Sequence, residues 1–167
     1  MLARSMGMNR HMIVSTRLGD LTLVASDNAL AGVYFPRHWV KPMPLGERVE
    51  SDPVLSEAAR QLDEYLSGDR TTFDLPTTLT GDEFQQRVWS RLSGIPFGTT
   101  TSYGEIAAEL GDHAQRVGKA VGQNPLSIVI PCHRVVGKNG SLTGYAGGLK
   151  RKQFLLDLEE PAEVRLF

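Results

Sequence analysis

The residue with the most distinctive chemistry in this sequence is its single cysteine, Cys132. A thiolate rather than a thiol is the nucleophile, and an adjacent histidine in positive surroundings favours the thiolate. Both conditions are met, because Cys132 is followed by His133 and Arg134. A lone cysteine is more often a small buried hydrophobic residue, but these neighbours favour a reactive thiol over that alternative. We therefore predict that Cys132 is a nucleophile.

The four residues from Ser127 to Ile130 form a short apolar run that predicts a strand. Proline cannot extend a central strand, so the chain is expected to leave the sheet at Pro131. The thiol would then lie at the end of a rigid element, where reactive groups are well held.

Basic residues cluster around the thiol. From His113 to Lys152 the sequence has no Asp or Glu but seven basic residues: Arg116, Lys119, Arg134, Lys138, Lys150, Arg151 and Lys152. The other 11 of the 18 basic residues and all 19 acidic residues lie outside this stretch, although the net charge of the whole chain is only -1. Polyanion binding depends on the local field, so the stretch predicts a nucleic-acid partner. Chance clustering on a solvated surface is the alternative.

The composition excludes several classes of protein. With 41% hydrophobic and 22% charged residues among 167, the chain can bury a real core, and no apolar run approaches the roughly 18 residues of a membrane span. The N-terminus lacks the apolar region of a secretory signal. One cysteine excludes an intrachain disulfide and fits a reducing cytoplasm. Because His11, His38 and His113 are scattered, no zinc site is expected.

The first half predicts a small sheet and one helix. Three runs rich in Val, Leu, Ile and aromatic residues, at 12–15, 21–26 and 30–35, are separated by turn residues and predict an antiparallel meander. A proline-rich loop follows at 36–46. Asp52 and Pro53 then predict the start of a helix that Gly68 ends, and an extended linker from 70 to 80 marks a domain boundary near residue 80.

The second half reads as helical. Thr80 with Glu83, and Ser102 with Glu105, match the spacing of capping boxes at two helix starts. The first of these helices carries one apolar stripe, and the second ends at Gly111, where a further helix follows within a few residues. The stripe consists of Phe84, Val88 and Leu92, and the inward residues of the later helices are Ile106, Ala107, Leu110, Ala114, Val117, Gly118 and Val121. Helix, glycine turn and helix within about twenty residues predict a helix-turn-helix.

At these residues the sequence closely resembles the O6-alkylguanine-DNA alkyltransferases. The resemblance rests on Pro131-Cys132-His133-Arg134-Val135, on Asn124-Pro125 before it, on Gly144-Tyr145-Ala146-Gly147-Gly148 after it, and on Ser102-Tyr103-Gly104-Glu105-Ile106-Ala107. It runs without a gap from Phe84 to Glu159, and the N-terminal half matches more loosely. The resemblance implies an α/β (α+β) fold. Residues 1–80 would form a small ribonuclease H-like β-sheet domain with a helix, and residues 81–167 a mostly helical DNA-binding and catalytic domain.

The resemblance also implies a reaction: DNA repair by direct reversal of damage. An alkyl group passes from O6-alkylguanine (less favoured, O4-alkylthymine) in duplex DNA to Cys132 in one irreversible step, after the damaged base is flipped out of the helix. By similarity, His133 takes the thiol proton through a water, Glu159 orients His133, and Tyr103 donates a hydrogen bond to the guanine. Glu159 lies 27 positions after Cys132, with Glu160 beside it as the alternative. Each molecule would act once, with no cofactor and no metal.

The remaining roles implied by the resemblance concern binding. Asn124 would tie the recognition helix to the active-site strand, and the guanine pocket would be formed by Asn124, Val135, Tyr145, Ala146 and Gly147. Contacts with DNA, largely to phosphates and with the recognition helix in the minor groove, would come from Ala114, Gln115, Arg116, Gly118, Lys119 and Arg134. Nine residues before Asn124, where many members carry an intercalating arginine, this chain has Gln115, and Arg116 follows it. Either residue could fill the gap left by the flipped base.

The expected partner is double-stranded DNA containing O6-alkylguanine, bound by a monomer or by cooperative assembly, with no membrane involved. Three alternatives remain open. The first is a non-catalytic alkyltransferase-like protein that only binds lesions, although such relatives replace the cysteine. The second is a cysteine hydrolase that uses Cys132, His133 and Glu159, and the third is a helix-turn-helix regulator with an incidental thiol.

Overall fold

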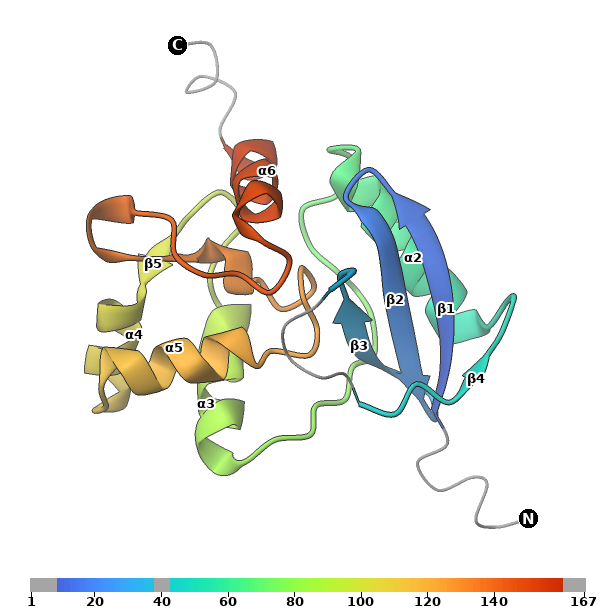
Figure 1. Ribbon diagram of the computed structural model, residues 1–167, viewed down its shortest axis with the longest axis horizontal. Coiled ribbons are helices and arrows are strands. Elements are labelled where there is room, and N and C mark those ends of the chain that lie inside the picture. The colour runs from blue at the N-terminus through green and yellow to red at the C-terminus, as the bar shows by residue number, and fades with distance from the viewer. Residues whose placement is uncertain (1–8, 38–42, 161–167) are drawn as a thin grey trace. The chain divides into compact units, whose positions relative to one another are not determined.

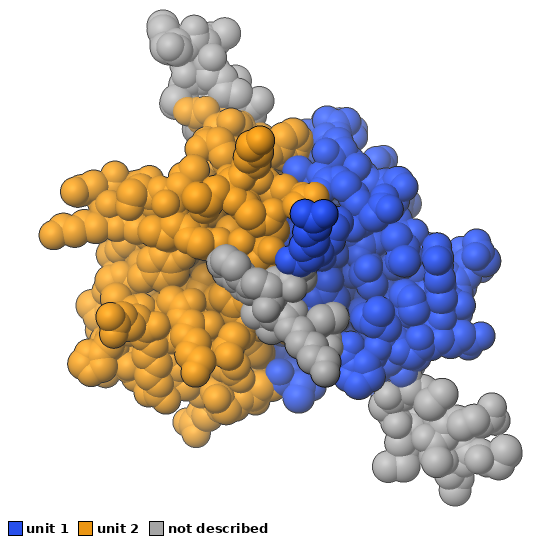
Figure 2. Space-filling view, in the orientation of Figure 1, with its two compact units in different colours: residues 1–80 blue, residues 81–167 orange. Residues whose placement is uncertain are grey.

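The structure is a computed structural model that describes residues 9–37 and 43–160. Its contacts divide the chain into two compact units, residues 1–80 and 81–167 (Figure 2). The two units are described separately below. In the part of the chain that the structure describes, no helix combines the length and the apolarity needed to cross a bilayer.

The first unit is built on a four-stranded sheet in the order β3-β2-β1-β4 (Figure 1). Its strands are β1 (Asn9–Thr16), β2 (Gly19–Ser26), β3 (Ala29–Tyr34) and β4 (Glu47–Arg48). β1, β2 and β3 pair antiparallel, which confirms the predicted meander, and β4 pairs parallel with β1. β4 was not predicted, because two exposed charged residues carry no strand pattern.

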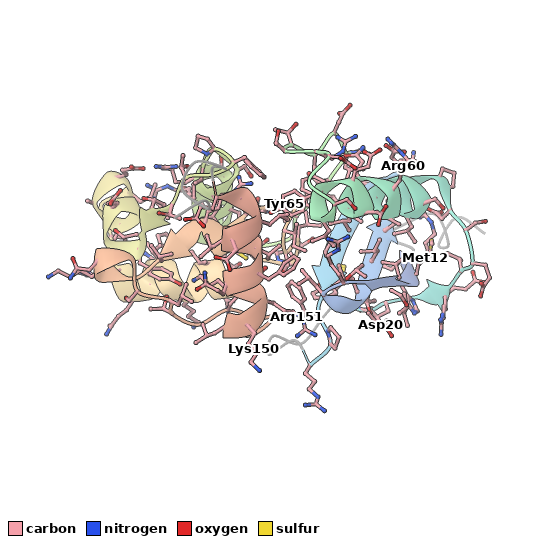
Figure 3. All side chains as sticks on the ribbon, turned by 90° about the horizontal axis from the view of Figure 1, so that it is seen from above. Met12, Asp20, Arg60, Tyr65, Lys150 and Arg151 are labelled. Atoms are coloured by element: carbon pink, nitrogen blue, oxygen red, sulfur yellow. The ribbon has the colours of Figure 1, made fainter. Side chains whose placement is uncertain are left out.

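Helix α2 (Pro53–Leu66) begins where Asp52 and Pro53 predict a helix start. It packs on the sheet. The Asp52 carboxylate accepts hydrogen bonds from the backbone N–H groups of Val54 and Leu55, both at 3.0 Å. The same carboxylate pairs with Arg10 of β1. Leu55, Ala58, Leu62, Tyr65 and Leu66 are buried on α2, whereas Arg60 lies on the side away from the strands (Figure 3). The helix ends at Leu66, and Gly68 follows at φ +84°.

The segment from 70 to 80, predicted as an extended linker, is held to the first unit by hydrogen bonds. It forms a bridge with the outer strand β3, where Leu30 N–H donates to Pro76 O at 2.8 Å and Thr78 N–H donates to Leu30 O at 2.9 Å. The buried Gln61 side chain donates to Asp74 O and accepts from Asp74 N–H. These bonds cover an edge strand whose backbone groups would otherwise be open.

The second unit is mostly helical, with one short two-stranded sheet (Figure 1). Its elements are α3 (Glu83–Ser93), β5 (Thr101–Ser102), α4 (Tyr103–Leu110), α5 (Ala114–Gly122), the 3-10 helix η1 (Cys132–Arg134), β6 (Val135–Val136), the 3-10 helix η2 (Lys138–Gly140) and α6 (Leu149–Glu159). β5 and β6 pair parallel, so the start of α4 lies beside the segment that follows the cysteine.

Helix α3 begins two residues later than the predicted capping box. The box is formed by Asp82 and Gln85, not by Thr80 and Glu83, because Asp82 is the residue whose carboxylate reaches the N–H of Gln85 at 2.7 Å. Val88 and Leu92 are buried as expected. Trp89 is buried too, and its indole N–H donates to Ala120 O of α5 at 2.9 Å.

Helices α4 and α5 pack against each other. The turn that connects them begins at Gly111, which adopts a left-handed conformation with φ +70°. Ser102 caps α4 by accepting from Glu105 N–H at 3.1 Å. In a complete capping box the Glu105 carboxylate would accept from the backbone N–H of Ser102. Here it accepts instead from the hydroxyl of Thr101. The predicted box is therefore only half formed. Of the residues expected to face inward, Ile106, Ala107, Val117 and Val121 are buried, whereas Ala114 is exposed and Leu110 and Gly118 are half-buried.

Candidate active site

The segment before the cysteine is a tight turn, so the predicted strand at 127–130 is wrong. Val129 N–H donates to Ser127 O at 2.8 Å around Ile128, whose φ is +74°. This is the rare γ-turn geometry, which a β-branched residue adopts only at a cost of about 1–3 kcal/mol. Sequence alone did not distinguish the two structures, because a short apolar run suits a buried turn as well as a buried strand.

Asn124 holds this turn closed. Its buried side-chain amide donates to Ile130 O at 2.8 Å, and its carbonyl accepts from Leu126 N–H at 3.0 Å. One side chain after the end of α5 therefore fixes both ends of the turn that leads to Cys132. In this position Asn124 stabilises the backbone that leads to Cys132.

Asn124→Ala is expected to lower the free energy of unfolding by about 1–3 kcal/mol, because it leaves the buried N–H of Leu126 without its partner. The Ile130 carbonyl loses the Asn124 bond but keeps the one from Cys132 N–H. The matched control is Gln123→Ala, which removes the neighbouring amide and its bond from Gln85. Urea unfolding would measure both variants. Equal losses in the two would contradict a special role for Asn124.

Cys132 is the first residue of η1, and its side chain is buried, with 5% of the residue exposed. Burial raises the pKa of the thiol, while hydrogen bonding by Asn124 and the charge of Lys152 lower it. The net direction is upward, so the resting thiol is protonated. The sequence argument expected the reverse, because it counted positive charges and not the burial of the thiol, which has the larger effect on the pKa.

His133, the next residue, is completely buried and faces Glu159 at the end of α6. Its Nε2 lies 2.8 Å from Glu159 Oε2. Because a carboxylate only accepts hydrogen bonds, Nε2 carries the proton and Nδ1 is the basic nitrogen. Burial lowers the pKa of His133 and the Glu159 charge partly offsets that effect, so the imidazole is neutral at pH 7 and able to accept a proton.

Arg134 completes this group as the partner of Glu159. Its guanidinium donates to both carboxylate oxygens, from Nε at 2.7 Å and from Nη2 at 2.8 Å, and to Ile95 O at 2.6 Å. Arg134 is only 7% exposed. The prediction that it contacts DNA does not fit this buried position. Arg134 instead holds Glu159 in place, and these contacts select Glu159 over Glu160 as the residue that faces His133.

Tyr103 lies at the start of α4 and is held by Thr143, whose hydroxyl donates to the Tyr103 oxygen at 3.0 Å. Burial raises the pKa of Tyr103, and the nearby Cys132 raises it further. The phenol is therefore protonated at neutral pH. Since Thr143 donates to its oxygen, Tyr103 has its own proton left to donate.

Of the predicted pocket residues, Asn124 precedes the cysteine, and the other four lie in the segments that follow it. Val135, Tyr145 and Gly147 are buried, and Ala146 is half-buried. The carbonyl of Val135 accepts a hydrogen bond from Lys152 at 2.7 Å. The part played by Lys152 was missed by the sequence analysis, although a signal existed. Lys152, Leu155 and Glu159 are the buried residues of α6, and their helical spacing places two charged residues on its inward face.

Helix α5 presents the residues predicted to contact DNA. Ala114, Gln115, Arg116 and Lys119 are exposed, and Gly118 is half-buried. A Cβ at Gly118 would lie 3.6 Å from the Tyr103 ring, so α5 and the tyrosine lie close together. Arg116 forms an ion pair with Asp112 at 2.6 Å and lies over the ring of Phe84, with 3.9 Å from its guanidinium carbon to the ring centre.

The stretch from His113 to Lys152, which has no Asp or Glu, contributes less surface charge than its sequence suggested. Arg134 and Lys152 are buried, which leaves five of its seven basic residues available to solvent: Arg116, Lys119, Lys138, Lys150 and Arg151. Lys150 extends away from the start of α6 (Figure 3).

Across residues 9–37 and 43–160, no three His, Cys, Asp or Glu side chains form a group that could hold a metal ion. His38 lies outside the described residues.

Comparison with known proteins decides the family. Residues 83–161 match the model of the 6-O-methylguanine DNA methyltransferase DNA binding domain, and residues 9–79 match the ribonuclease-like domain of the same family. The chain belongs to the 6-O-methylguanine DNA methyltransferase family. The first match contains Cys132, His133, Arg134 and Glu159 together, so the whole cluster lies within the family's DNA binding domain.

Relatives in this methyltransferase family match over nearly the full chain. The methylated-DNA–protein-cysteine methyltransferase of Mycolicibacterium paratuberculosis is 44% identical, covering 96% of this chain and 99% of the relative. The inducible enzyme of that name from Bacillus subtilis is 43% identical, covering 92% and 86%. The crystal structure of Mycobacterium tuberculosis OGT in complex with DNA matches with a TM-score of 0.81 at 41% identity, covering 95% of this chain and 99% of that one. These matches confirm the fold class expected from the resemblance.

Proposed function

We propose that this protein repairs DNA by direct reversal, taking the alkyl group of O6-alkylguanine in duplex DNA onto Cys132 in a single irreversible transfer. The observation that carries the proposal is the buried thiol directly followed by the His133–Glu159–Arg134 group, in a chain whose relatives are named methylated-DNA–protein-cysteine methyltransferases. DNA is the partner that the DNA binding domain of the family indicates.

The site supplies a base for the nucleophile. The Cys132 proton passes to Nδ1 of His133, directly or through one water, and Glu159 stabilises the resulting imidazolium through Nε2. The sulfur electron pair then forms the S–C bond to the alkyl carbon. The C–O6 bond breaks, and its electron pair goes to the guanine. A thioether is a poor leaving group, so the alkylated protein is not regenerated.

Tyr103 serves the leaving group. Guanine leaves with an extra electron pair, and a proton donor at its edge lowers the barrier. The raised pKa of Tyr103 keeps its phenol protonated for this task. Val135, Tyr145, Ala146 and Gly147 are proposed to enclose the flipped base. Flipping costs a few kcal/mol and is cheapest for a mispaired lesion.

The exposed face of α5 is proposed to contact the minor groove through Ala114, Gln115, Gly118 and Lys119. For Arg116 to enter the duplex, it would have to leave Asp112 and Phe84, where the free protein holds it. Gln115 has no ion pair or ring contact of this kind among the described residues, and it occupies the position nine residues before Asn124. The structure therefore favours Gln115 as the residue that fills the space of the flipped base.

Binding to undamaged duplex DNA is expected to weaken as NaCl is raised, with a slope of log affinity against log salt no steeper than about -4.5. That limit takes the five basic residues of the 113–152 stretch that solvent reaches, four exposed and Arg151 half-buried, at about -0.9 per neutralised phosphate. Fluorescence anisotropy over a series of salt concentrations would measure it. A flat response would remove the electrostatic argument, and a slope near -6 would mean that basic residues beyond these five also contact phosphates.

The test of the function is to mix the protein with a duplex containing one O6-methylguanine and to weigh the intact protein. Stoichiometric gain of one methyl group, mapped to Cys132, is expected, and a duplex with ordinary guanine is the control. Unmodified protein that still binds the lesion would support a non-catalytic binder. Repeated turnover on a thioester substrate would support a hydrolase. Selective binding to one undamaged operator would support a regulator.

Action as a monomer, a cytoplasmic location, and independence of metals and cofactors also remain proposals. The single thiol suits a reducing compartment, and the damaged DNA itself supplies the alkyl group.

A further inference from the structure

Thr143 is notable because three separate contacts fix its position. Its hydroxyl donates to the phenol oxygen of Tyr103 at 3.0 Å, although 40 positions separate the two residues in sequence. Its backbone carbonyl accepts a hydrogen bond from the Lys152 ammonium at 3.2 Å. Its methyl group faces Gly137, where an added Cβ would lie only 2.9 Å from the methyl carbon. The hydroxyl is therefore presented to Tyr103 by a side chain that has little freedom to turn.

The backbone brings Tyr103 to the site, but it does not fix the phenol. β5 ends directly before Tyr103 and pairs with β6, which directly follows the 3-10 helix that carries Cys132. One edge of the Tyr103 ring lies near Gly118 of α5, where an added Cβ would be 3.6 Å away. The oxygen at the far end of the ring is held by Thr143.

The direction of this hydrogen bond decides what the phenol can do. A phenol has one proton to donate and lone pairs that accept. Because Thr143 donates, it uses a lone pair of the phenol oxygen and leaves the phenol proton unused. Among residues 9–37 and 43–160, no protein group accepts that proton. The phenol is therefore free to donate to a group that enters the site.

We propose that Thr143 is a positioning residue for methyl transfer, because its hydroxyl holds the Tyr103 phenol with the phenol proton available to the departing guanine. The hydrogen bond that the phenol receives also makes it a stronger donor, since each bond in such a chain polarises the next. Both protons stay on their own oxygens throughout. The inference rests on the proposed function, and it concerns the leaving group rather than the nucleophile.

The test begins with Thr143→Val, which removes the hydroxyl and keeps the size of the side chain. Single-turnover transfer from a duplex containing O6-methylguanine is expected to slow by about 3- to 10-fold, the effect of one ordinary hydrogen bond. Thr143→Ser keeps the hydroxyl and should transfer at close to the wild-type rate. The matched control is Ser141→Ala, which removes a hydroxyl that donates to Lys138 O in the same segment and should match the wild type. A wild-type rate in Thr143→Val would overturn the proposal.

Two comparisons separate positioning of the phenol from support of the fold. In Tyr103→Phe the Thr143 hydroxyl has lost its partner, so adding Thr143→Val should slow transfer no further. Iodomethane releases iodide, which needs no proton donor, so it should methylate Cys132 equally fast in Thr143→Val and in the wild type. A further loss in the double variant, or slower reaction with iodomethane, would mean that Thr143 acts through the fold and would overturn the proposal.

A measurement without DNA tests the contact itself. The hydrogen bond from Thr143 lowers the pKa of Tyr103, although burial raises that pKa by more. NMR titration of the Tyr103 ring should therefore give a higher pKa in Thr143→Val than in the wild type. Thr143→Ala also lacks the hydroxyl and should show the same rise, which covers the case that Thr143→Val does not fold. An unchanged or lower pKa would overturn the proposal. The expected rise, in a wild-type protein that takes no methyl group from DNA, would instead contradict the proposed function.

Discussion

Cys132→Ser is expected to abolish methyl transfer while the protein still binds a duplex containing O6-methylguanine. Serine has nearly the same shape but is a far weaker acid than cysteine, so His133 cannot generate a comparable nucleophile. A fall of at least about 10⁴-fold is expected, equivalent to about 5.5 kcal/mol in the barrier. Binding should persist, because the proposed DNA-contacting face of α5 does not include Cys132.

Mass spectrometry of the intact protein would measure transfer, and anisotropy would measure binding. The chain has one cysteine, so a thiol introduced elsewhere in the Cys132→Ser protein is the only thiol that could be methylated. Ser67→Cys in the Cys132→Ser protein places a thiol at an exposed position in the first unit. That relocated thiol should gain no methyl group. Methylation of residue 67, or loss of lesion binding in Cys132→Ser alone, would contradict the assignment of Cys132 as the acceptor.

Much of the fold was predictable because its signals are local. Asp52 before Pro53 marks the start of α2, and Gly111 marks the end of α4, in each case through the backbone geometry that these residue types prefer. The start of α3 was misplaced by two residues because Thr80 and Asp82 both suit a helix N-cap. Only the folded chain shows that Asp82 is the residue that bonds Gln85.

The misreadings at the site share a physical cause: burial cannot be read from charge. Arg134 and Lys152 stand in a basic run that resembles a DNA-binding surface, yet both are buried. Arg134 holds Glu159, and Lys152 donates to the carbonyls of Val135 and Thr143. Contacts between residues that are distant in sequence determine these roles, so the residue types alone did not reveal them.

Glu159→Gln is expected to slow methyl transfer by about 10²–10⁴-fold, the usual range for general acid–base catalysis, while lesion binding changes little. The carboxylate now selects the tautomer with the proton on Nε2 of His133. A glutamine amide could donate to Nε2 instead, which would place the ring proton on Nδ1 and block the base. Loss of the negative charge would also lower the pKa of His133 further, because Glu159 raises it.

The same substitution leaves Arg134 buried without its anion, which should cost about 3–5 kcal/mol of stability. Stability and chemistry can be separated by adding Arg134→Met. The double variant removes the unpaired cation and should recover much of the stability but none of the transfer rate. Glu160→Gln, on the adjacent residue, should transfer like the wild type. Recovery of transfer in the double variant would mean that Glu159 matters only as a counter-ion for Arg134, and that His133 does not depend on it.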